Sequence, residues 1–123
     1  MADNARIAVI EDDPEIGPML GRILKLEGFE ATLINQGITA LASLRHGNFQ
    51  AAILDVMLPG KDGLSILREI RDTSETASLP VIMLTAKIDD TTTWEGWKAG
   101  ANYFMTKPFD PDELVRVLHE VLA

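Results

Sequence analysis

Five short apolar runs, separated by segments with helical periodicity, set the strongest constraint on how this 123-residue chain can fold. The runs are continuous and rich in β-branched residues, which is typical of strands buried on both faces of a parallel sheet. Strands alternating with helices through short connections predict an α/β fold, in which one parallel sheet carries helices on both faces. We expect the strands at 6–10, 29–34, 51–54, 81–84 and 103–106.

Start and stop signals place a helix after each expected strand. Asp13-Pro14 and Asp110-Pro111 each combine an N-cap aspartate with a proline at the first helical position. Gly28, Gly47 and Gly100 stand where three of the helices are expected to end. Besides the two helices that follow Asp13 and Asp110, three more are expected at 37–46, 64–71 and 89–99.

Composition and charge argue against several classes of protein, among them nucleic-acid-binding, disulfide-bonded and membrane-spanning proteins. The net charge of −8 argues against direct binding of nucleic acid, which depends on lysine and arginine neutralising phosphates. The absence of cysteine excludes disulfides and thiolate metal sites and favours a cytoplasmic location. No apolar stretch approaches the roughly 18 residues of a membrane span, and no secretory signal is visible. We therefore expect one domain over 1–123, with 1–5 as a short N-terminal extension and no output module.

Charged and polar residues follow four of the five expected strands. Glu11, Asp12 and Asp13 follow the first strand, and Asp55 follows the third. Thr85 and Lys107 come directly after the fourth and fifth strands. Ligands of open parallel sheets bind outside the carboxyl ends of the strands, so these side chains should meet at one edge.

This combination favours magnesium and phosphoryl chemistry. Crowded carboxylates repel one another unless a cation joins them, and Mg²⁺ is commonly held by one or two carboxylates with water and phosphate oxygens. The edge contains no histidine or cysteine, which makes a zinc site improbable. An aspartate can also act as a nucleophile that forms an aspartyl phosphate. Phosphoryl transfer then needs mainly positioning and neutralisation of charge, which Mg²⁺, Lys107 and the Thr85 hydroxyl could supply.

Four motifs stand in order along the chain: Glu11-Asp12-Asp13, Asp55 through Gly63, Thr85-Ala86, and Gly100-Ala101 through Lys107-Pro108-Phe109. Together they resemble one known family, the receiver domains of two-component signalling. The resemblance covers the chain from the first strand to the last helix. It implies a doubly wound, flavodoxin-like sheet of five strands in the order 2-1-3-4-5.

The resemblance also implies a role for each residue of the motifs. Asp55 resembles the phosphoacceptor, and Asp12 and Asp55 resemble the residues that bind magnesium directly. Glu11 would reach the metal partly through water, and the backbone carbonyl of Met57 would be a further ligand. Lys107 resembles the lysine that contacts the phosphoryl group. In this family the bond that corresponds to Lys107-Pro108 is often cis.

The expected switch involves Thr85 as its hydroxyl and Phe104 as its aromatic residue. Tyr103 is a rival for the aromatic role, but alternation along the strand puts the two rings on opposite faces of the sheet. Asp13 is read as the cap of the first helix rather than as a metal ligand. Trp97 is expected to pack in the core, and Trp94 to be partly exposed.

The function implied is a phosphoacceptor switch rather than an enzyme with an external substrate. A sensor histidine kinase or phosphotransfer protein would donate the phosphoryl group to Asp55. The face made by the fourth helix, fifth strand and fifth helix would then bind a second copy or an output domain. Two alternatives are an interaction module that signals without phosphate and a phosphatase with an aspartate nucleophile. The second acid that such phosphatases use is replaced here by Met57.

Overall fold

The computed structural model describes residues 5–58, 61–86 and 90–123, without the side chains of 90–92. Strands and helices alternate along the chain, as the sequence pattern predicts. The strands are β1 (Arg6–Ile10), β2 (Glu30–Ile34), β3 (Ala51–Asp55), β4 (Val81–Thr85) and β5 (Tyr103–Thr106). The helices are α1 (Ile16–Leu26), α2 (Gly37–Gly47), α3 (Gly63–Asp72), α4 (Asp90–Ala99) and α5 (Pro111–Leu122).

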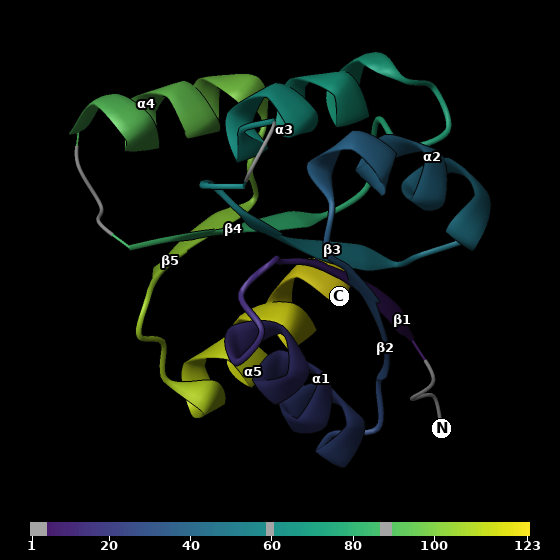
Figure 1. Cartoon of the computed structure of the whole chain (residues 1–123), viewed down its shortest axis with the longest axis vertical. Coiled ribbons are helices and arrows are strands. Elements are labelled where there is room, and N and C mark those ends of the chain that lie inside the picture. Colours follow the sequence, from purple (N-terminus) through teal and green to yellow (C-terminus); the bar gives the residue numbers. More distant parts are fainter. Residues whose placement is uncertain (1–4, 59–60, 87–89) are drawn as a thin grey trace.

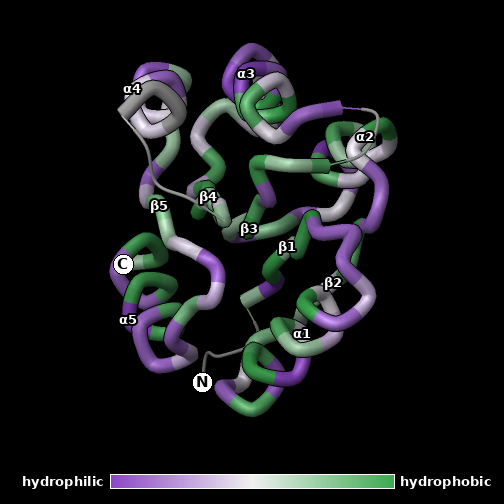
Figure 2. Tube along the Cα trace, turned by 60° about the vertical axis from the view of Figure 1, so that its left-hand side comes forward, coloured by the Kyte–Doolittle hydropathy of each residue, from purple (hydrophilic) through white to green (hydrophobic). Residues whose placement is uncertain are grey.

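The five strands form one parallel sheet in the order β2-β1-β3-β4-β5, which confirms the expected topology. The helices cover both faces, with α1 and α5 on one side and α2, α3 and α4 on the other (Figure 1). The hydropathy colouring shows apolar strands in the middle and mixed, more polar helices outside (Figure 2). This is the layered arrangement that buries the apolar runs on both faces.

Two apolar clusters, one on each face of the sheet, hold the layers together. Successive residues of a strand point to opposite faces, so Ile53 faces α1 and α5 whereas Leu54 faces the other three helices. The same alternation separates the two aromatic residues of β5. Phe104 belongs to the cluster under α2, α3 and α4, and Tyr103 packs against the opposite cluster, as expected.

Two helix ends differ from the sequence-based expectation. Helix α1 begins at Ile16, because Pro14 and Glu15 form a turn rather than the first helical residues. Helix α2 continues through Gly47, and Asn48 takes the left-handed conformation with φ of 55°. Asparagine tolerates that conformation better than most residues, which explains how the helix ends without a glycine there. The expected start of the fourth helix at Asp89 lies outside the described residues.

None of the helices in the described part of the chain is both long and apolar enough to cross a membrane.

Candidate functional site at the carboxyl edge of the sheet

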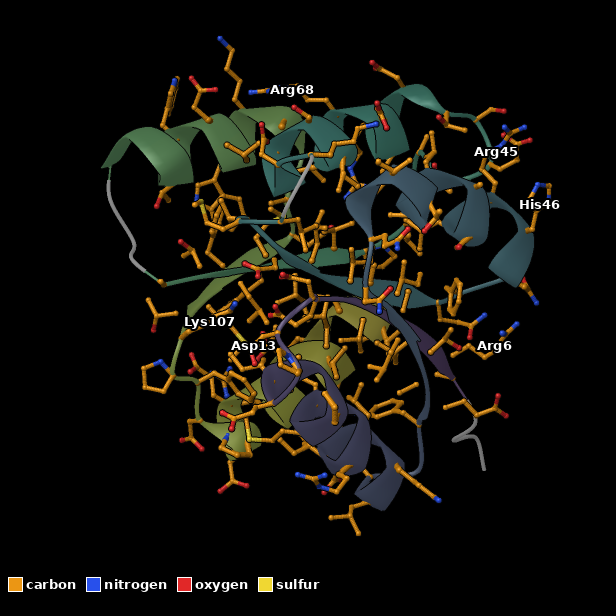
Figure 3. The ribbon with its side chains drawn as sticks, in the orientation of Figure 1. Arg6, Asp13, Arg45, His46, Arg68 and Lys107 are labelled. Carbon is orange, nitrogen blue, oxygen red and sulfur yellow. The ribbon has the colours of Figure 1, made fainter. Side chains whose placement is uncertain are left out.

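Strand register gathers the predicted site residues at one edge of the sheet. In the ladder between β3 and β4, Asp55 lies opposite Leu84, and Thr85 lies opposite Thr106 of β5. Glu11 and Asp12 follow the last residue of β1, and Lys107 follows the last residue of β5. Figure 3 shows Lys107 and Asp13 at this carboxyl edge, whereas Arg6 of β1 lies at the opposite edge.

Three carboxylates at this edge form the acidic cluster, which we define as Glu11, Asp12 and Asp55. One carboxylate oxygen from each residue lies within 4.8 Å of the others. Glu11 and Asp55 are each only 3% exposed, whereas Asp12 is open to solvent. The cluster therefore combines two buried carboxylates with one that can meet a ligand arriving from water.

Lys107 supplies the positive charge of the site. Its Nζ lies 2.9 Å from Oδ2 of Asp55 and 2.9 Å from Oε1 of Glu11. The backbone N–H of Lys107 donates to the carbonyl of Thr85 at 2.8 Å, which fixes the start of the following loop against β4. The Lys107-Pro108 bond is cis, as the resemblance implies.

Burial and charge shift the ionisation of these groups. Burial raises the pKa of Glu11 above its ordinary value, and the nearby ammonium of Lys107 offsets part of that shift. Burial by itself would lower the pKa of Lys107, but the carboxylates of Asp55 and Glu11 beside it outweigh this effect and raise that pKa. When all four groups are charged, three carboxylates face one ammonium, so the site keeps a net charge of −2.

The residues of the acidic cluster fit a hard divalent cation. Among the described residues, Oε1 of Glu11 is buried and accepts no hydrogen bond of good geometry, although the Lys107 ammonium is near. Oxygen ligands with spare capacity beside an exposed carboxylate are the donor set that Mg²⁺ prefers. The backbone of Met57 also lies beside the cluster, since its N–H donates to Oδ1 of Asp55 at 3.1 Å.

Thr85 and Phe104 share one face of the sheet near the cluster. Thr85 is buried at the end of β4, two residues after Met83, so both side chains point toward the same face. Met83 pairs with Phe104, whose ring is buried under α4. The predicted switch pair therefore lies on the face of the sheet that α4 covers, with the Phe104 ring against Gly96 and Trp97 of that helix.

Asp13 caps the first turn of α1 and is not part of the acidic cluster. Its Oδ1 accepts hydrogen bonds from the backbone N–H groups of Glu15 at 2.8 Å and Ile16 at 3.1 Å. These hydrogen bonds lower the pKa of the Asp13 carboxyl below its ordinary value of 3.8. The expected capping contact of Asp13 is therefore present, but the expectation that Asp13 is the N-cap itself is wrong, because the N-cap position of α1 is Glu15.

Comparison with known proteins agrees with this geometry. The family described as the response regulator receiver domain matches residues 7–119. This chain belongs to that family. It is 42% identical over 122 residues to the transcriptional regulatory protein CseB of Streptomyces coelicolor, covering 99% of this chain and 51% of that protein. It is 40% identical over 110 residues to the DNA-binding response regulator MtrA of Mycolicibacterium smegmatis, covering 89% of this chain and 47% of that protein.

Solved structures of other receiver domains superpose closely on this one. The receiver domain of the sensor histidine kinase PA1611 from Pseudomonas aeruginosa is 32% identical, with a TM-score of 0.90 and coverage of 97% of this chain and 98% of that one. That structure holds a magnesium ion in its active site cleft. The receiver domain of the Francisella response regulator 1452 is 29% identical, with a TM-score of 0.89 and 97% coverage of both chains. This chain spans about half the length of the curated relatives it matches.

The sequence analysis included Gly63 in a motif but did not predict its packing against the end of β3, which carries Asp55. The N–H of Gly63 donates to the carbonyl of Val56 at 2.8 Å, so the start of α3 folds back onto the end of β3. A Cβ at Gly63 would overlap the carbonyl oxygen of Asp55 and lie 2.8 Å from Cα of Val56. The glycine follows Asp62, the N-cap of α3, but nothing in its local sequence shows which strand it approaches.

The prediction for Trp97 is wrong in part. Its side chain remains 48% exposed, although one edge contacts the buried ring of Phe104, with ring centroids 5.5 Å apart. Trp94 is 67% exposed, as expected. Both tryptophans of this receiver domain therefore reach the surface of α4.

Proposed function

We propose that this receiver domain accepts a phosphoryl group on Asp55 from a histidine kinase or a phosphotransfer protein. The observation that carries the proposal is a buried Asp55 carboxylate held 2.9 Å from the Lys107 ammonium within the acidic cluster. A carboxylate placed in this way can attack phosphorus while a neighbouring cation offsets the charge of the incoming group. The chain would act as a signalling phosphoacceptor, not as an enzyme with an external substrate.

The transfer step exchanges one bond to phosphorus for another. An Asp55 oxygen forms a bond to the phosphorus of a phosphohistidine, the P–N bond breaks, and its electron pair leaves with the imidazole, which takes up a proton. Lys107 would then turn from the free carboxylates to a phosphoryl oxygen, and the Thr85 hydroxyl would donate to another. Later hydrolysis of the aspartyl phosphate would reset the domain.

Asp12 and Asp55 would hold Mg²⁺ directly, with the Met57 carbonyl as a further ligand and Glu11 acting partly through water. The bound ion would supply positive charge to the carboxylates and to the phosphoryl oxygens. Two observations support this assignment: the oxygen-rich acidic cluster and the magnesium ion in the cleft of the related PA1611 receiver domain.

The output would be a change at the face formed by α4, β5 and α5. Movement of Thr85 toward the phosphoryl group opens space beside Phe104, and a shift of that ring alters its contact with α4. Phosphorylation would then favour one of two conformations of this face that already exist without phosphate. Because the relatives are about twice as long and are named as transcriptional or DNA-binding regulators, an output domain or a second copy is the expected partner of this face.

The direct test is the intact mass of the protein after incubation with Mg²⁺ and acetyl phosphate. We expect one phosphoryl adduct, absent with EDTA and absent in Asp55→Asn. Asp62→Asn is the matched control, because Asp62 is an exposed cap of α3 and asparagine can keep its hydrogen bond from Ser65. An adduct that persists in Asp55→Asn would refute the assignment of the acceptor. No adduct in the unchanged protein would favour a module that signals without phosphate.

A further inference from the structure

The loop between β3 and α3 would supply a backbone ligand, the Met57 carbonyl, to the proposed magnesium site. The structure describes this loop at residues 56–58 and 61–62. Val56 and Leu58 are buried in the apolar cluster under α2, α3 and α4, whereas the Met57 side chain between them is 72% exposed. The N–H of Met57 donates to Oδ1 of Asp55 at 3.1 Å. The first limb of the loop is therefore held both by the core and by Asp55.

The second limb of the same loop is held by Lys61, which forms an ion pair with α3. Its Nζ lies 2.5 Å from Oε2 of Glu69, and the two side chains are only 30% and 39% exposed. A partly buried pair of this kind is screened less than a fully exposed one. Two residues after Lys61, the N–H of Gly63 donates to the carbonyl of Val56 at 2.8 Å. The position of Lys61 is thus connected to the backbone that follows β3.

Lys61 is also packed against the first residue of α2, which lies beside α3 on this face of the sheet (Figure 1). A Cβ built on Gly37 would lie 3.2 Å from both Cβ and the carbonyl oxygen of Lys61, and 3.1 Å from Cδ1 of Ile66. These distances are shorter than ordinary van der Waals contacts, so a side chain at position 37 would push the loop away. Glycine at this position permits the close approach of the two backbones.

We propose that Gly37, Lys61 and Glu69, which we call the loop clamp, are positioning residues for the Met57 backbone and thereby for the binding of Mg²⁺. The loop clamp holds the loop in the metal-free protein, so less ordering of the loop remains to be done when an ion binds. The connection to the ion rests on the proposed role of Met57 as a ligand, whereas the loop clamp itself is a property of the metal-free chain.

The charge of Lys61 makes the direction of the effect informative. By charge alone, removing a positive charge from the protein would strengthen the binding of a cation. Loss of a positioning contact would weaken that binding, because the ion would then have to order the loop. Glu69→Gln does not make this distinction, since its effect on charge and its effect on positioning both weaken cation binding. Lys61→Met is therefore the variant that tests the proposal.

Titration of the unphosphorylated full chain with MgCl₂, followed by backbone amide NMR, measures the affinity without a phosphoryl donor. We expect Lys61→Met to weaken Mg²⁺ binding by about two- to fivefold, the range that a partly exposed ion pair can contribute. Binding should stay weak when Glu69→Gln is added, whereas charge alone predicts nearly natural binding, because the two lost charges cancel. The matched control is Lys25→Met, which removes an exposed lysine near the end of α1 and should not weaken binding.

A second readout needs no metal. Hydrogen exchange of the Met57 and Gly63 amides, measured in EDTA, reports how firmly the loop is held. Both amides should exchange faster in Lys61→Met by about two- to fivefold. They should also exchange faster in Gly37→Ala, although alanine in place of glycine normally favours a helix. The matched control is Gly21→Ala in α1, where the new Cβ would meet one side-chain atom at 4.0 Å and should leave both amides unchanged.

The outcomes separate the loop clamp from the proposed magnesium site. Faster exchange together with weaker Mg²⁺ binding in Lys61→Met would support the loop clamp. Unchanged exchange in both Lys61→Met and Gly37→Ala would overturn it, and so would Mg²⁺ binding in Lys61→Met that is as tight as in the natural chain or tighter. If the natural chain shows no response to Mg²⁺, the proposed metal site is wrong, and the exchange rates alone decide whether these residues hold the loop.

Discussion

At the scale of single residues, Lys107 decides how two buried carboxylates can coexist. Its ammonium lies within 2.9 Å of an oxygen of both Glu11 and Asp55, so each carboxylate has a nearby positive charge despite its burial. One ammonium cannot balance three carboxylates, and the remaining negative charge is what a cation would neutralise. In the proposed function, the same lysine would also contact the incoming phosphoryl group.

Asp13 provides a prediction for the acid range, measured in EDTA so that metal binding does not contribute. The pKa of Asp13 is lowered in the folded protein by the N–H groups of Glu15 and Ile16. A lowered folded pKa means that the contribution of Asp13 is fully present above the unfolded value, near 3.8. That contribution is lost as pH falls through the lower folded pKa.

The expected result is a stability difference between the natural chain and Asp13→Asn that shrinks below about pH 4. Asparagine can still cap the helix but does not titrate, which makes it the appropriate comparison. Urea unfolding at several pH values between roughly 3 and 7 measures the difference. A difference that grows as pH falls would contradict the assignment of Asp13 as a charged cap.

The contrast between Asp13 and Trp97 shows which residue roles can be read from a sequence. The capping contact of Asp13 depends on backbone groups two and three residues away, so its signal is local, although α1 begins later than expected, with Glu15 as its N-cap. The half-exposed position of Trp97 depends on a ring from β5 and on Gly96, and no local pattern contains that information. The packing of Gly63 against the backbone of Asp55 and Val56 was not predicted either, because the residues next to it in sequence do not show which backbone atoms it approaches.

At the scale of elements, the position of the site follows from parallel strands with aligned carboxyl ends. The periodicity of the apolar runs was enough to predict the strands, and the rule that ligands bind beyond those ends located the site. The ends of α1 and α2 were predicted less well. Pro14-Glu15 and Asn48 each adopt one of several turn conformations that their sequence allows, and tertiary packing selects among them.

Arg71 connects α3 to the starts of β4 and β5, which leads to a prediction about stability. Its guanidinium is partly buried and donates to the carbonyls of Leu79 and Gly100 and to Asn102, so it joins α3 to the starts of β4 and β5. Arg71→Met would remove the donor from the part-buried carbonyls of Leu79 and Gly100, and we expect a loss of about 1–3 kcal/mol in the free energy of unfolding.

Arg68→Met is the matched control for Arg71. Arg68 lies one turn earlier on α3 and pairs with Glu95 of α4 at 2.8 Å, but both side chains are about half exposed. Exposed pairs contribute little, so the control should lose less than about 1 kcal/mol. Equal losses in the two variants, measured by urea unfolding, would show that the buried carbonyl contacts of Arg71 are not the source of its effect.

At the scale of the whole molecule, the excess of negative charge and its concentration at the carboxyl edge of the sheet both affect the stability of the fold. The chain carries a net charge of −8, and part of that charge is concentrated in the acidic cluster, where it opposes folding through repulsion. A divalent cation that binds only the folded cluster would relieve this repulsion. Cation binding should therefore appear as a gain in global stability, independent of any phosphoryl donor.

Magnesium at about ten times its dissociation constant should stabilise the fold by about 1.4 kcal/mol, or raise the melting temperature by about 5 °C. Thermal unfolding with increasing Mg²⁺, followed by excess EDTA, measures the gain and its reversal. Asp12→Asn should abolish most of it, because Asp12 is the exposed carboxylate of the cluster, whereas Asp62→Asn should keep it. If Asp12→Asn responds as strongly as the natural chain, the stabilising ion binds elsewhere on this acidic surface, and Asp12 is not its ligand.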